Sequence, residues 1–230
     1  MKIININELL FDENNIIGAG HYGIVKKCTY NGKTYAYKEL YEPNKTLTPM
    51  NIYKFESLSK LNKEYMELPK ILIEKNKNNI GYLTEYLNED VLLKSINLES
   101  SVIITKLKII KQKLEEMHKL GIIHCDIHSL NIVGNKFIDF DGSCYKNIKP
   151  SYLMIDPNYD RYGITPELDI GMFNLVTYQL LFGYDHGIKA LIGIRNEDFG
   201  NFNDEQIEIC ENLIYSDELP TKKYLIDTFK

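Results

Sequence analysis

Two carboxylates and one carboxamide follow one another closely in the middle of the chain. Asp126 and Asn131 lie in the run 124–131, and Asp139 lies in the run 138–142. Transfer of a γ-phosphoryl group needs a carboxylate that orients the acceptor hydroxyl and oxygen ligands that hold magnesium against the phosphates. Asp126 is spaced for the first role, and Asn131 and Asp139 are spaced for the second. The spacing predicts phosphoryl transfer to a hydroxyl group.

A simpler interpretation of this region is an ordinary turn. Side chains of Asp, Asn and His often hydrogen-bond to the local backbone in turns, and that role requires no catalysis. The motifs that surround the region, and the order in which they occur, favour the catalytic interpretation.

The upstream region contains three glycines in the spacing G-x-G-x-x-G: Gly18, Gly20 and Gly23. This spacing alone is weak evidence, since it also occurs in dinucleotide-binding folds. The residues after Val25 alternate and then turn at 31–32, which is typical of a β-hairpin, whereas a dinucleotide fingerprint opens a helix. We therefore expect a lid over the phosphates of ATP, where glycines let backbone amides approach. Lys38 would reach the α- and β-phosphates.

The pattern H-x-D-x-x-x-x-N, from His124 to Asn131, is followed by D-F at residues 139–140. Both patterns match the catalytic and metal-binding loops of protein kinases, so the chain resembles the protein-kinase-like superfamily, as a minimal Ser/Thr-type domain with atypical features. The resemblance implies one domain with an α+β, bilobal fold. A β-rich N-lobe would cover residues 1–87, and a mainly α-helical C-lobe would cover 88–230. ATP would bind in the cleft between the lobes, with Mg²⁺ as cofactor.

The resemblance also assigns residues to the adenine site. Val25 and Ala36 would cover the adenine ring, although each could equally be an ordinary strand residue. The joint between the lobes would offer the carbonyl of Glu85 and the amide of Leu87 to the adenine edge, with Thr84 as gatekeeper. A plain strand end is the alternative for this joint.

In kinases a helical glutamate pairs with the lysine that holds the phosphates. Glu56 lies eighteen residues after Lys38 and is the only acidic residue of the expected helix. If Leu58 and Leu61 mark the inward face, however, the expected acidic position falls on Lys54. Glu56 is therefore either the ion-pair partner of Lys38 or a solvated surface charge.

The resemblance continues towards the C-terminus. The stretch 169–183 is similar to the buried kinase helix that begins with an aspartate. Asp169 would then brace the backbone of the catalytic loop, which is compatible with a role as helix cap. Segments 208–214 and 222–229 look like the two closing helices.

Some departures from the family pattern concern regulation. Cys125 replaces the arginine that in many kinases binds a phosphate on the activation loop, and an uncharged thiol cannot pair with a phosphate. The family's A-P-E motif corresponds to residues 156–158, at the end of a short segment that begins at Asp139. We expect activity without that switch and a reduced platform for a peptide substrate.

Two further departures concern the acceptor. His128 occupies a position where Ser/Thr protein kinases usually have lysine. The forms D-x-H-x-x-N and I-D-F-D look like those of aminoglycoside, choline and lipopolysaccharide sugar kinases. In such an enzyme Asp141 could join Asp139 at a second magnesium ion. The alternative for Asp141 is a turn residue before Gly142.

The elements that must position these residues fall into two groups. Strand-like segments dominate the first part of the chain: 14–18, 23–30, 33–40, 69–75 and 80–86. One helix interrupts them near Thr48-Pro49, where threonine can cap and proline suits the first turn. Later apolar residues recur at helical spacing up to Gly121, namely Val102, Ile103, Leu107, Ile110, Leu114 and Met117. Strands followed by helices indicate an α+β arrangement.

Composition is that of a compact enzyme, with 230 residues and a net charge of -5. This charge gives no electrostatic case for binding nucleic acid or membranes. No apolar run approaches the roughly 18 residues that a membrane span needs, and residues 1–8 lack a signal-peptide core. Four cysteines are scattered without C-x-x-C spacing: Cys28, Cys125, Cys144 and Cys210. We expect a soluble, cytoplasmic protein with reduced thiols.

These observations together predict an ATP-dependent kinase that phosphorylates Ser or Thr hydroxyls of a protein substrate. Asp126 would orient the hydroxyl, Lys38 and the glycine lid would hold the phosphates, and the metal would bind to Asn131 and Asp139. A small-molecule kinase of the aminoglycoside or choline type is the alternative enzyme. A pseudokinase scaffold is a third possibility, but its hallmark would be a missing Lys, Asp or Asn at these positions, and none is missing.

Overall fold

The computed structural model describes residues 1–20, 22–149 and 163–182. The chain divides into two compact units. Unit 1 contains Met1–Glu89 and two short later segments, which include Lys136–Asp141. Unit 2 contains Asp90–Asn135, Gly142–Lys146 and the later helix described below. The expected helices 208–214 and 222–229, and the segment 156–158, lie outside the described residues.

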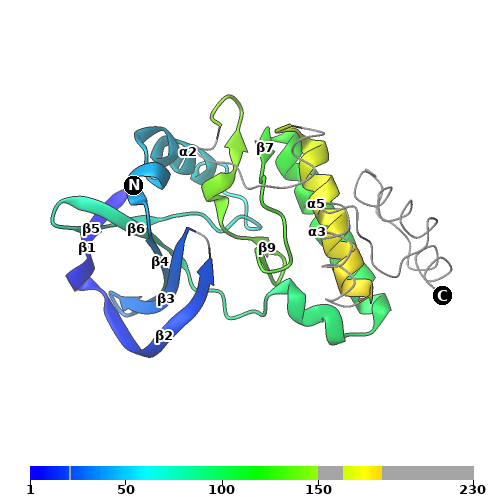
Figure 1. Ribbon diagram of the computed structural model, residues 1–230, viewed down its shortest axis with the longest axis horizontal. Helices are drawn as coiled ribbons and strands as arrows, with labels where there is room; N and C mark the ends of the chain where they lie inside the picture. The colour runs from blue at the N-terminus through cyan, green and yellow to red at the C-terminus, as the bar shows by residue number, and fades with distance from the viewer. Residues whose placement is uncertain (21, 150–162, 183–230) are drawn as a thin grey trace, which may run out of the picture. The chain divides into compact units, whose positions relative to one another are not determined.

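Unit 1 is built on a six-stranded sheet in the order β1-β5-β6-β4-β3-β2 (Figure 1). Its strands are β1 (Lys2–Asn5), β2 (Leu10–Gly20), β3 (Gly23–Tyr30), β4 (Lys33–Leu40), β5 (Ile71–Lys75) and β6 (Asn78–Glu85). All neighbouring pairs are antiparallel except β1 and β5, which run parallel. The core of this unit includes the fully buried Tyr37, Ile73 and Leu83.

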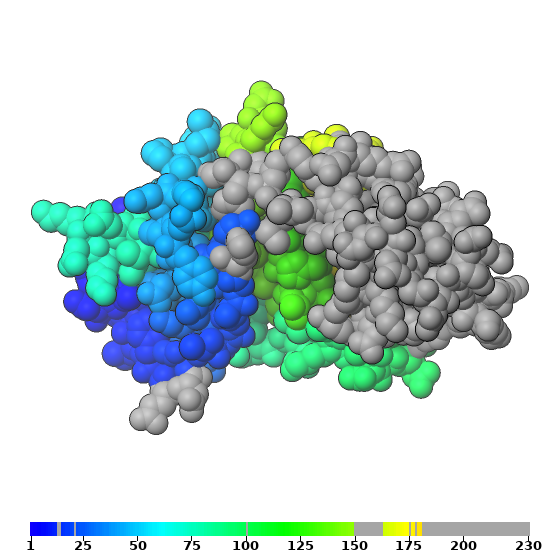
Figure 2. All heavy atoms as spheres, in the orientation of Figure 1, coloured from blue at the N-terminus to red at the C-terminus, as the bar shows by residue number. Residues whose placement is uncertain are grey.

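The β3–β4 hairpin confirms the turn predicted at residues 31–32. Asn31 and Gly32 have φ angles of 49° and 73°. Tight two-residue hairpins need this left-handed backbone, which Asn and Gly adopt at low cost. The turn fixes the register of β3 against β4, and this register pairs Val25 with Lys38. The turn between β5 and β6 projects from the surface of unit 1 (Figure 2).

Two features at the start of the chain differ from the sequence predictions. The first predicted strand, 14–18, is part of the longer β2, whose pairing with β3 shifts register around Ile16. The preceding β1 was not predicted, because its four residues carry no turn signal and pair in parallel with the distant β5. A short 3-10 helix, η1 (Ile6–Glu8), connects β1 to β2.

The helix α2 (Pro49–Ser59) follows a single turn, α1 (Pro43–Thr46). Thr48 caps α2 as predicted, since its hydroxyl accepts a hydrogen bond from the Asn51 amide at 3.2 Å. The buried face of α2 consists of four residues at helical spacing: Asn51, Lys54, Phe55 and Leu58. A lysine therefore faces inward beside aromatic and aliphatic side chains.

The segment Lys136–Asp141 belongs to unit 1 through backbone hydrogen bonds. The amide of Phe137 donates to the carbonyl of Tyr65 at 2.8 Å, and the amide of Glu67 donates to the carbonyl of Phe137 at 2.9 Å. This segment contains the short strand β9 (Lys136–Phe137) and leads into the 3-10 helix η3 (Phe140–Gly142). Asp139 and Asp141 are thereby carried to the sheet of unit 1.

Unit 2 is mainly helical. Its elements are η2 (Leu92–Asn97), α3 (Ser100–Lys119), β7 (Ile122–Ile123), β8 (Ile132–Val133), β10 (Cys144–Tyr145) and α5 (Pro166–Phe182). The predicted stripe of α3 is buried at Ile103, Leu107, Ile110, Leu114 and Met117, whereas Val102 is exposed. The stop at Gly121 is confirmed by its φ of 75°. Helices α3 and α5 pack side by side (Figure 1). Among the described residues, no helix has the length and apolarity needed to cross a membrane.

Candidate active site

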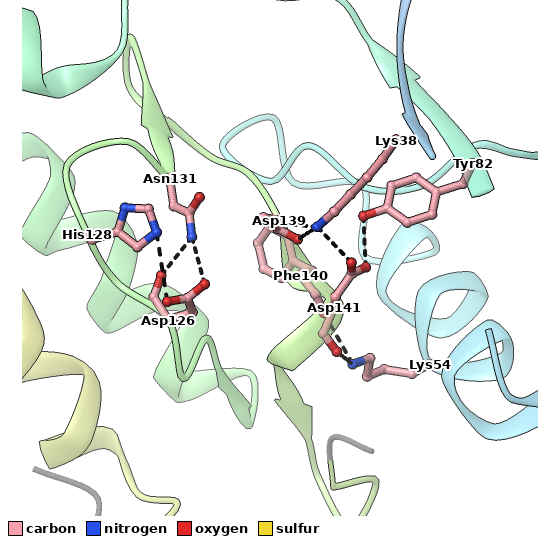
Figure 3. A network of polar contacts seen from close by, with 9 residues as sticks. All are labelled: Lys38, Lys54, Tyr82, Asp126, His128, Asn131, Asp139, Phe140 and Asp141. Carbon is pink, nitrogen blue, oxygen red and sulfur yellow. Dashed lines mark hydrogen bonds and ion pairs between the residues drawn. The ribbon is translucent and has the colours of Figure 1, made fainter. Parts of the chain in front are cut away.

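Lys38 and two carboxylates form a compact ionic cluster in unit 1 (Figure 3). The Lys38 ammonium donates to both oxygens of Asp139, at 2.5 and 2.6 Å, and to Oδ2 of Asp141 at 2.8 Å. Lys38 comes from the middle of β4, and only 8% of its surface is exposed. The sequence analysis placed Lys38 and Asp139 at one site, and the structure brings them together.

Asp141 is held on more than one side. Its Oδ1 accepts a hydrogen bond of 2.8 Å from the Tyr82 hydroxyl, and 1% of the residue is exposed. The Lys54 ammonium donates to the backbone carbonyls of Phe140 and Asp141, at 3.2 and 3.1 Å. Figure 3 shows Lys38 and Tyr82 at the carboxylate of Asp141 and Lys54 at its backbone. Tyr82 and Lys54 belong to this cluster, and the sequence analysis assigned neither of them to it.

Electrostatics distinguish the members of the cluster. Burial lowers the pKa of Lys38, but the carboxylates of Asp141 and Asp139 outweigh burial, so the pKa is raised and the amine remains protonated. Burial raises the pKa of Asp141 above its ordinary value, because Lys38 offsets only part of the lost hydration. Asp139, in contrast, keeps 29% of its side chain exposed.

Asp139 also has an unusual backbone. Its φ is 61°, in the left-handed region that Asp adopts more readily than most residues. Non-glycine residues in this region cost of the order of 1 kcal/mol, and their neighbours must hold them there. For Asp139 the hydrogen bonds from Lys38 supply part of that restraint.

Glu56 does not pair with Lys38, so of the two alternatives that the sequence left open the ion pair with Lys38 is wrong. The Glu56 carboxylate is exposed and pairs with the amino terminus of Met1, and this contact lowers its pKa. The physical reason is the phase of α2, whose buried face contains Lys54 rather than Glu56. The Lys38 ammonium instead contacts Asp139 and Asp141.

One face of the sheet gathers the residues predicted to surround the nucleotide. Lys38 pairs with Val25 on β3 and with Tyr82 on β6, while Ala36 pairs with Thr84. Residues directly opposite in a ladder, and residues two apart in a strand, point to the same face. Val25, Ala36 and Lys38 are therefore on one face.

The three glycines predicted to form a lid differ in what packing requires. A Cβ at Gly23 would lie 2.2 Å from the carbonyl oxygen of Glu39, so the close approach of β4 requires glycine there. A Cβ at Gly18 would make only ordinary contact with Val25, and one at Gly20 would have nothing within 4 Å. Packing explains Gly23 and gives no reason for Gly20.

The end of β6 contains a buried acid that sequence reasoning missed. Glu67 Oε1 accepts a hydrogen bond of 2.8 Å from the Glu85 amide, and Glu67 is 4% exposed. The Glu85 carboxylate accepts hydrogen bonds from Lys70 and Lys33, which lower its pKa to about 2. The predicted contacts of the Glu85 carbonyl and the half-buried Leu87 amide with adenine stay predictions.

The loop with Asp126 and Asn131 is in unit 2 (Figure 3). The Asn131 side-chain amide donates to Oδ2 of Asp126 at 2.9 Å and to the Asp126 carbonyl at 3.1 Å. His128 Nε2 lies 3.8 Å from Asp126 Oδ1, and its side chain is 45% exposed. The loop thus fixes Asp126 through Asn131 and leaves 20% of the Asp126 side chain exposed.

Asp169 braces this loop, as the sequence analysis expected. Its carboxylate accepts hydrogen bonds from the amides of His124 and Cys125, at 2.7 and 2.8 Å, and lies 3.0 Å from His118 Nε2. Asp169 is fully buried. Cys125 has a φ of 64°, which a cysteine rarely adopts, so the brace holds a strained residue directly before Asp126.

Metal binding was predicted for Asn131, Asp139 and Asp141. Among the described residues, no group of three or more His, Cys, Asp or Glu side chains is placed to hold a metal ion. Asp139 and Asp141 lie together in unit 1, where both contact Lys38. The metal assignments stay predictions.

Comparison with known proteins agrees with this geometry. Residues 11–168 match the protein kinase domain model. The match covers more than half of the chain, which therefore belongs to the protein kinase family and has its α+β fold. The chain is also similar to the putative U-box domain-containing protein 53 of Arabidopsis thaliana, with 26% identity over 242 residues. This similarity covers 91% of the present chain and 29% of that protein, so the chain spans less than a third of its relative.

Proposed function

We propose that residues 1–230 form a single kinase domain that transfers the γ-phosphoryl group of ATP to a Ser or Thr hydroxyl of a protein. The observation that carries this proposal is the hydrogen bond between Asn131 and Asp126, which fixes a partly exposed carboxylate in a braced loop. Transfer to a hydroxyl needs such a carboxylate more than any covalent chemistry. We place the protein in the cytoplasm, with neither nucleic acid nor membrane as a partner, as its charge and scattered cysteines suggest.

Each residue group has a distinct part in the proposed reaction. Asp126 accepts the hydrogen bond of the acceptor hydroxyl and takes its proton as the acceptor oxygen bonds to the γ-phosphorus, while the bond from that phosphorus to the bridging oxygen breaks and ADP leaves. Lys38 donates to the α- and β-phosphates from the face that it shares with Val25 and Ala36, which contact the adenine ring. Gly18 and Gly20 let backbone amides approach the phosphates.

The chemistry of the two predicted ligands suits a hard divalent cation. Asp139 in unit 1 offers a carboxylate whose side chain is 29% exposed, and Asn131 in unit 2 is proposed as a ligand from its spacing in the sequence. Such oxygen ligands are the ones that Mg²⁺ prefers. When bound, Mg²⁺ would neutralise charge on the phosphates. The exchange of Asp139 from Lys38 to a cation would leave Lys38 with Asp141.

The acceptor of the alternative proposal is a small molecule. The observation that favours it is His128, which lies 3.8 Å from the carboxylate of Asp126 and is 45% exposed. The imidazole of His128 can donate or accept a hydrogen bond, and it would contact a small-molecule acceptor beside Asp126.

The test is transfer of labelled γ-phosphate by the purified chain to Ser- and Thr-containing peptides, with aminoglycosides and choline as competing acceptors. We expect phosphoserine or phosphothreonine. We expect Asp126→Asn to lower kcat by about 10²- to 10⁴-fold with little change in KM for ATP. Asp90→Asn is the matched control, because Asp90 is an exposed carboxylate of unit 2 that pairs with Lys94. Transfer only to small molecules would favour the alternative, and equal rates for Asp126→Asn and wild type would refute both.

A further inference from the structure

We infer that Asp141 is the positioning residue for Lys38, in the role that the sequence analysis gave to a glutamate on α2. This inference rests on the proposed function, because Lys38 matters as a ligand of the nucleotide phosphates. The three observations that support it are the inward face of α2, the contacts of Asp141 and the difference in exposure between Asp141 and Asp139.

The inward face of α2 contains a cation where an anion was expected. Lys54 is fully buried, and its ammonium donates to the carbonyls of Phe140 and Asp141. Glu56, the single acidic residue of α2, has a side chain that is 40% exposed and pairs with the amino terminus. The helix therefore supplies no carboxylate to Lys38, whose ammonium would be costly to bury without one.

Asp141 supplies the missing carboxylate from a fixed position. Its Oδ2 accepts from Lys38 at 2.8 Å, and its Oδ1 accepts from the Tyr82 hydroxyl at 2.8 Å. Both oxygens are thus directed by partners on the central strands β4 and β6. The Lys54 ammonium fixes the backbone of the same residue. A side chain held in this way can orient Lys38 without a contribution from an acidic residue of α2.

Asp139 and Asp141 are not equivalent around Lys38. The side chain of Asp139 is 29% exposed, whereas that of Asp141 is 2% exposed. A partly exposed carboxylate can exchange Lys38 for water, a cation or a ligand, whereas movement of the buried Asp141 would leave the Tyr82 hydroxyl without this acceptor in the interior. We therefore assign the constant contact with Lys38 to Asp141 and the exchangeable contact to Asp139.

The helix carries a charge opposite to the one expected, and the anionic partner of Lys38 comes from another segment. The cation Lys54 is on α2, where a glutamate was expected, and the anion Asp141 is on the segment that contains Asp139. As a result, Lys38 and the proposed metal ligand Asp139 are aligned by one segment of five residues, from Phe137 to Asp141, that unit 1 anchors through its backbone. Activity that does not depend on an acidic residue of α2 is the direct consequence.

The first measurement concerns the protein without nucleotide. Lysine side chains labelled with ¹³C and ¹⁵N report the mobility of each ammonium group by NMR relaxation at neutral pH. We expect Asp141→Asn to increase the mobility of the Lys38 ammonium, because the amide weakens the buried contact and leaves the partly exposed Asp139 as the remaining carboxylate partner. Glu56→Gln is the matched control on α2 and should leave the mobility of Lys38 unchanged. Equal mobility of Lys38 in Asp141→Asn and wild type would overturn the inference, whether or not the protein is a kinase.

The second measurement concerns nucleotide and metal. We expect Asp141→Asn to lower kcat/KM for ATP by about 10- to 100-fold, the usual range for one hydrogen bond to a charged group. The Mg²⁺ concentration for half-maximal rate should stay the same, whereas Asp139→Asn should raise it. A rise for Asp141→Asn as large as that for Asp139→Asn would show that Asp141 is a metal ligand and would overturn the inference. An inactive wild type would refute the proposed function alone, since the mobility of the Lys38 ammonium would still test its contact with Asp141.

Two further variants test the inference if Asp141→Asn does not fold. Tyr82→Phe removes only the hydroxyl that orients Asp141, and we expect a smaller loss of about 3- to 10-fold in kcat/KM for ATP. The double variant Lys54→Glu with Asp141→Asn returns a carboxylate to the inward face of α2. A folded double variant, as judged by its melting curve, should recover part of the lost kcat/KM. Full activity in both Asp141→Asn and Tyr82→Phe would contradict the inference.

Discussion

Two buried lysines in unit 1 are compensated in different ways. Lys38 contacts carboxylates, whereas Lys54 donates to the backbone carbonyls of Phe140 and Asp141. Burying an ammonium without such contacts is strongly unfavourable. Both lysines therefore converge on Asp141, one at its side chain and one at its backbone. The position of this one residue links the lysine of the strand to the lysine of the helix.

Glu67 allows a test of buried charge at the scale of one residue. Burial raises its pKa, although the Glu85 amide and Lys70 act in the opposite direction. A carboxyl whose pKa is raised in the folded state stabilises the fold below its unfolded-state pKa and loses that contribution as pH rises through the folded-state pKa. Glu67→Gln removes this dependence and keeps an oxygen that can accept from the Glu85 amide.

We therefore expect the melting temperature of Glu67→Gln, relative to wild type, to increase from about pH 4 to about pH 7. The gain at neutral pH should be roughly 1 to 3 °C. Melting curves at several pH values measure this difference. Glu64→Gln changes an exposed acid nearby and should shift the melting temperature little at any pH. If the melting temperature of Glu67→Gln minus that of wild type fell as pH rose, the sign would be wrong for a buried carboxylate whose pKa is raised.

At the scale of elements, α5 supports the loop before Asp126. Asp169 lies in the first turn of α5, where a carboxylate is favoured by the helix dipole. Its hydrogen bonds from the His124 and Cys125 amides hold the left-handed backbone of Cys125. The loop before Asp126 is therefore held by α5, and its independence of a phosphate elsewhere stays a prediction.

We expect Asp169→Asn to lower the free energy of unfolding by about 2 to 4 kcal/mol, because a carboxamide accepts these hydrogen bonds less strongly and leaves a buried donor poorly placed. The same change should lower kcat and change KM for ATP little, since it acts on Asp126 and not on Lys38. Urea denaturation and steady-state kinetics measure the two effects. Glu167→Gln alters an exposed acid of the same helical turn and should change neither value appreciably. A loss confined to KM for ATP would mean that the brace does not act through Asp126.

At the scale of the whole molecule, local signals predicted more than distant contacts did. The β3–β4 hairpin, the Thr48 cap and the stop of α3 at Gly121 are local and were predicted correctly. The parallel pairing of β1 with β5 joins residues about seventy positions apart, and no short pattern reveals it.

In the candidate site, too, local spacing was informative and contacts that depend on packing were not. The spacing of Asp126 and Asn131 predicted two residues that the structure places in hydrogen-bond contact. The sequence left the partner of Lys38 open, because Glu56 and Lys54 differ by two positions and only packing decides which of them faces inward. A buried tyrosine hydroxyl such as that of Tyr82 carries no sequence signal for its role.

Ligand-induced stability separates binding from catalysis in the intact chain. A ligand that binds only the folded state stabilises it by about 2.7 kcal/mol when its concentration is one hundred times Kd. We expect ATP with Mg²⁺ to raise the melting temperature of wild type and of Asp126→Asn by similar amounts, because Asp126 is proposed to contact the acceptor. Lys38→Met should lose most of this increase. The variant leaves Asp139 and Asp141 without their cation and melts lower by itself, so the shift between ligand-free and ligand-bound protein is the quantity to compare. An equal shift in Lys38→Met and wild type would place the nucleotide away from the ionic cluster of unit 1.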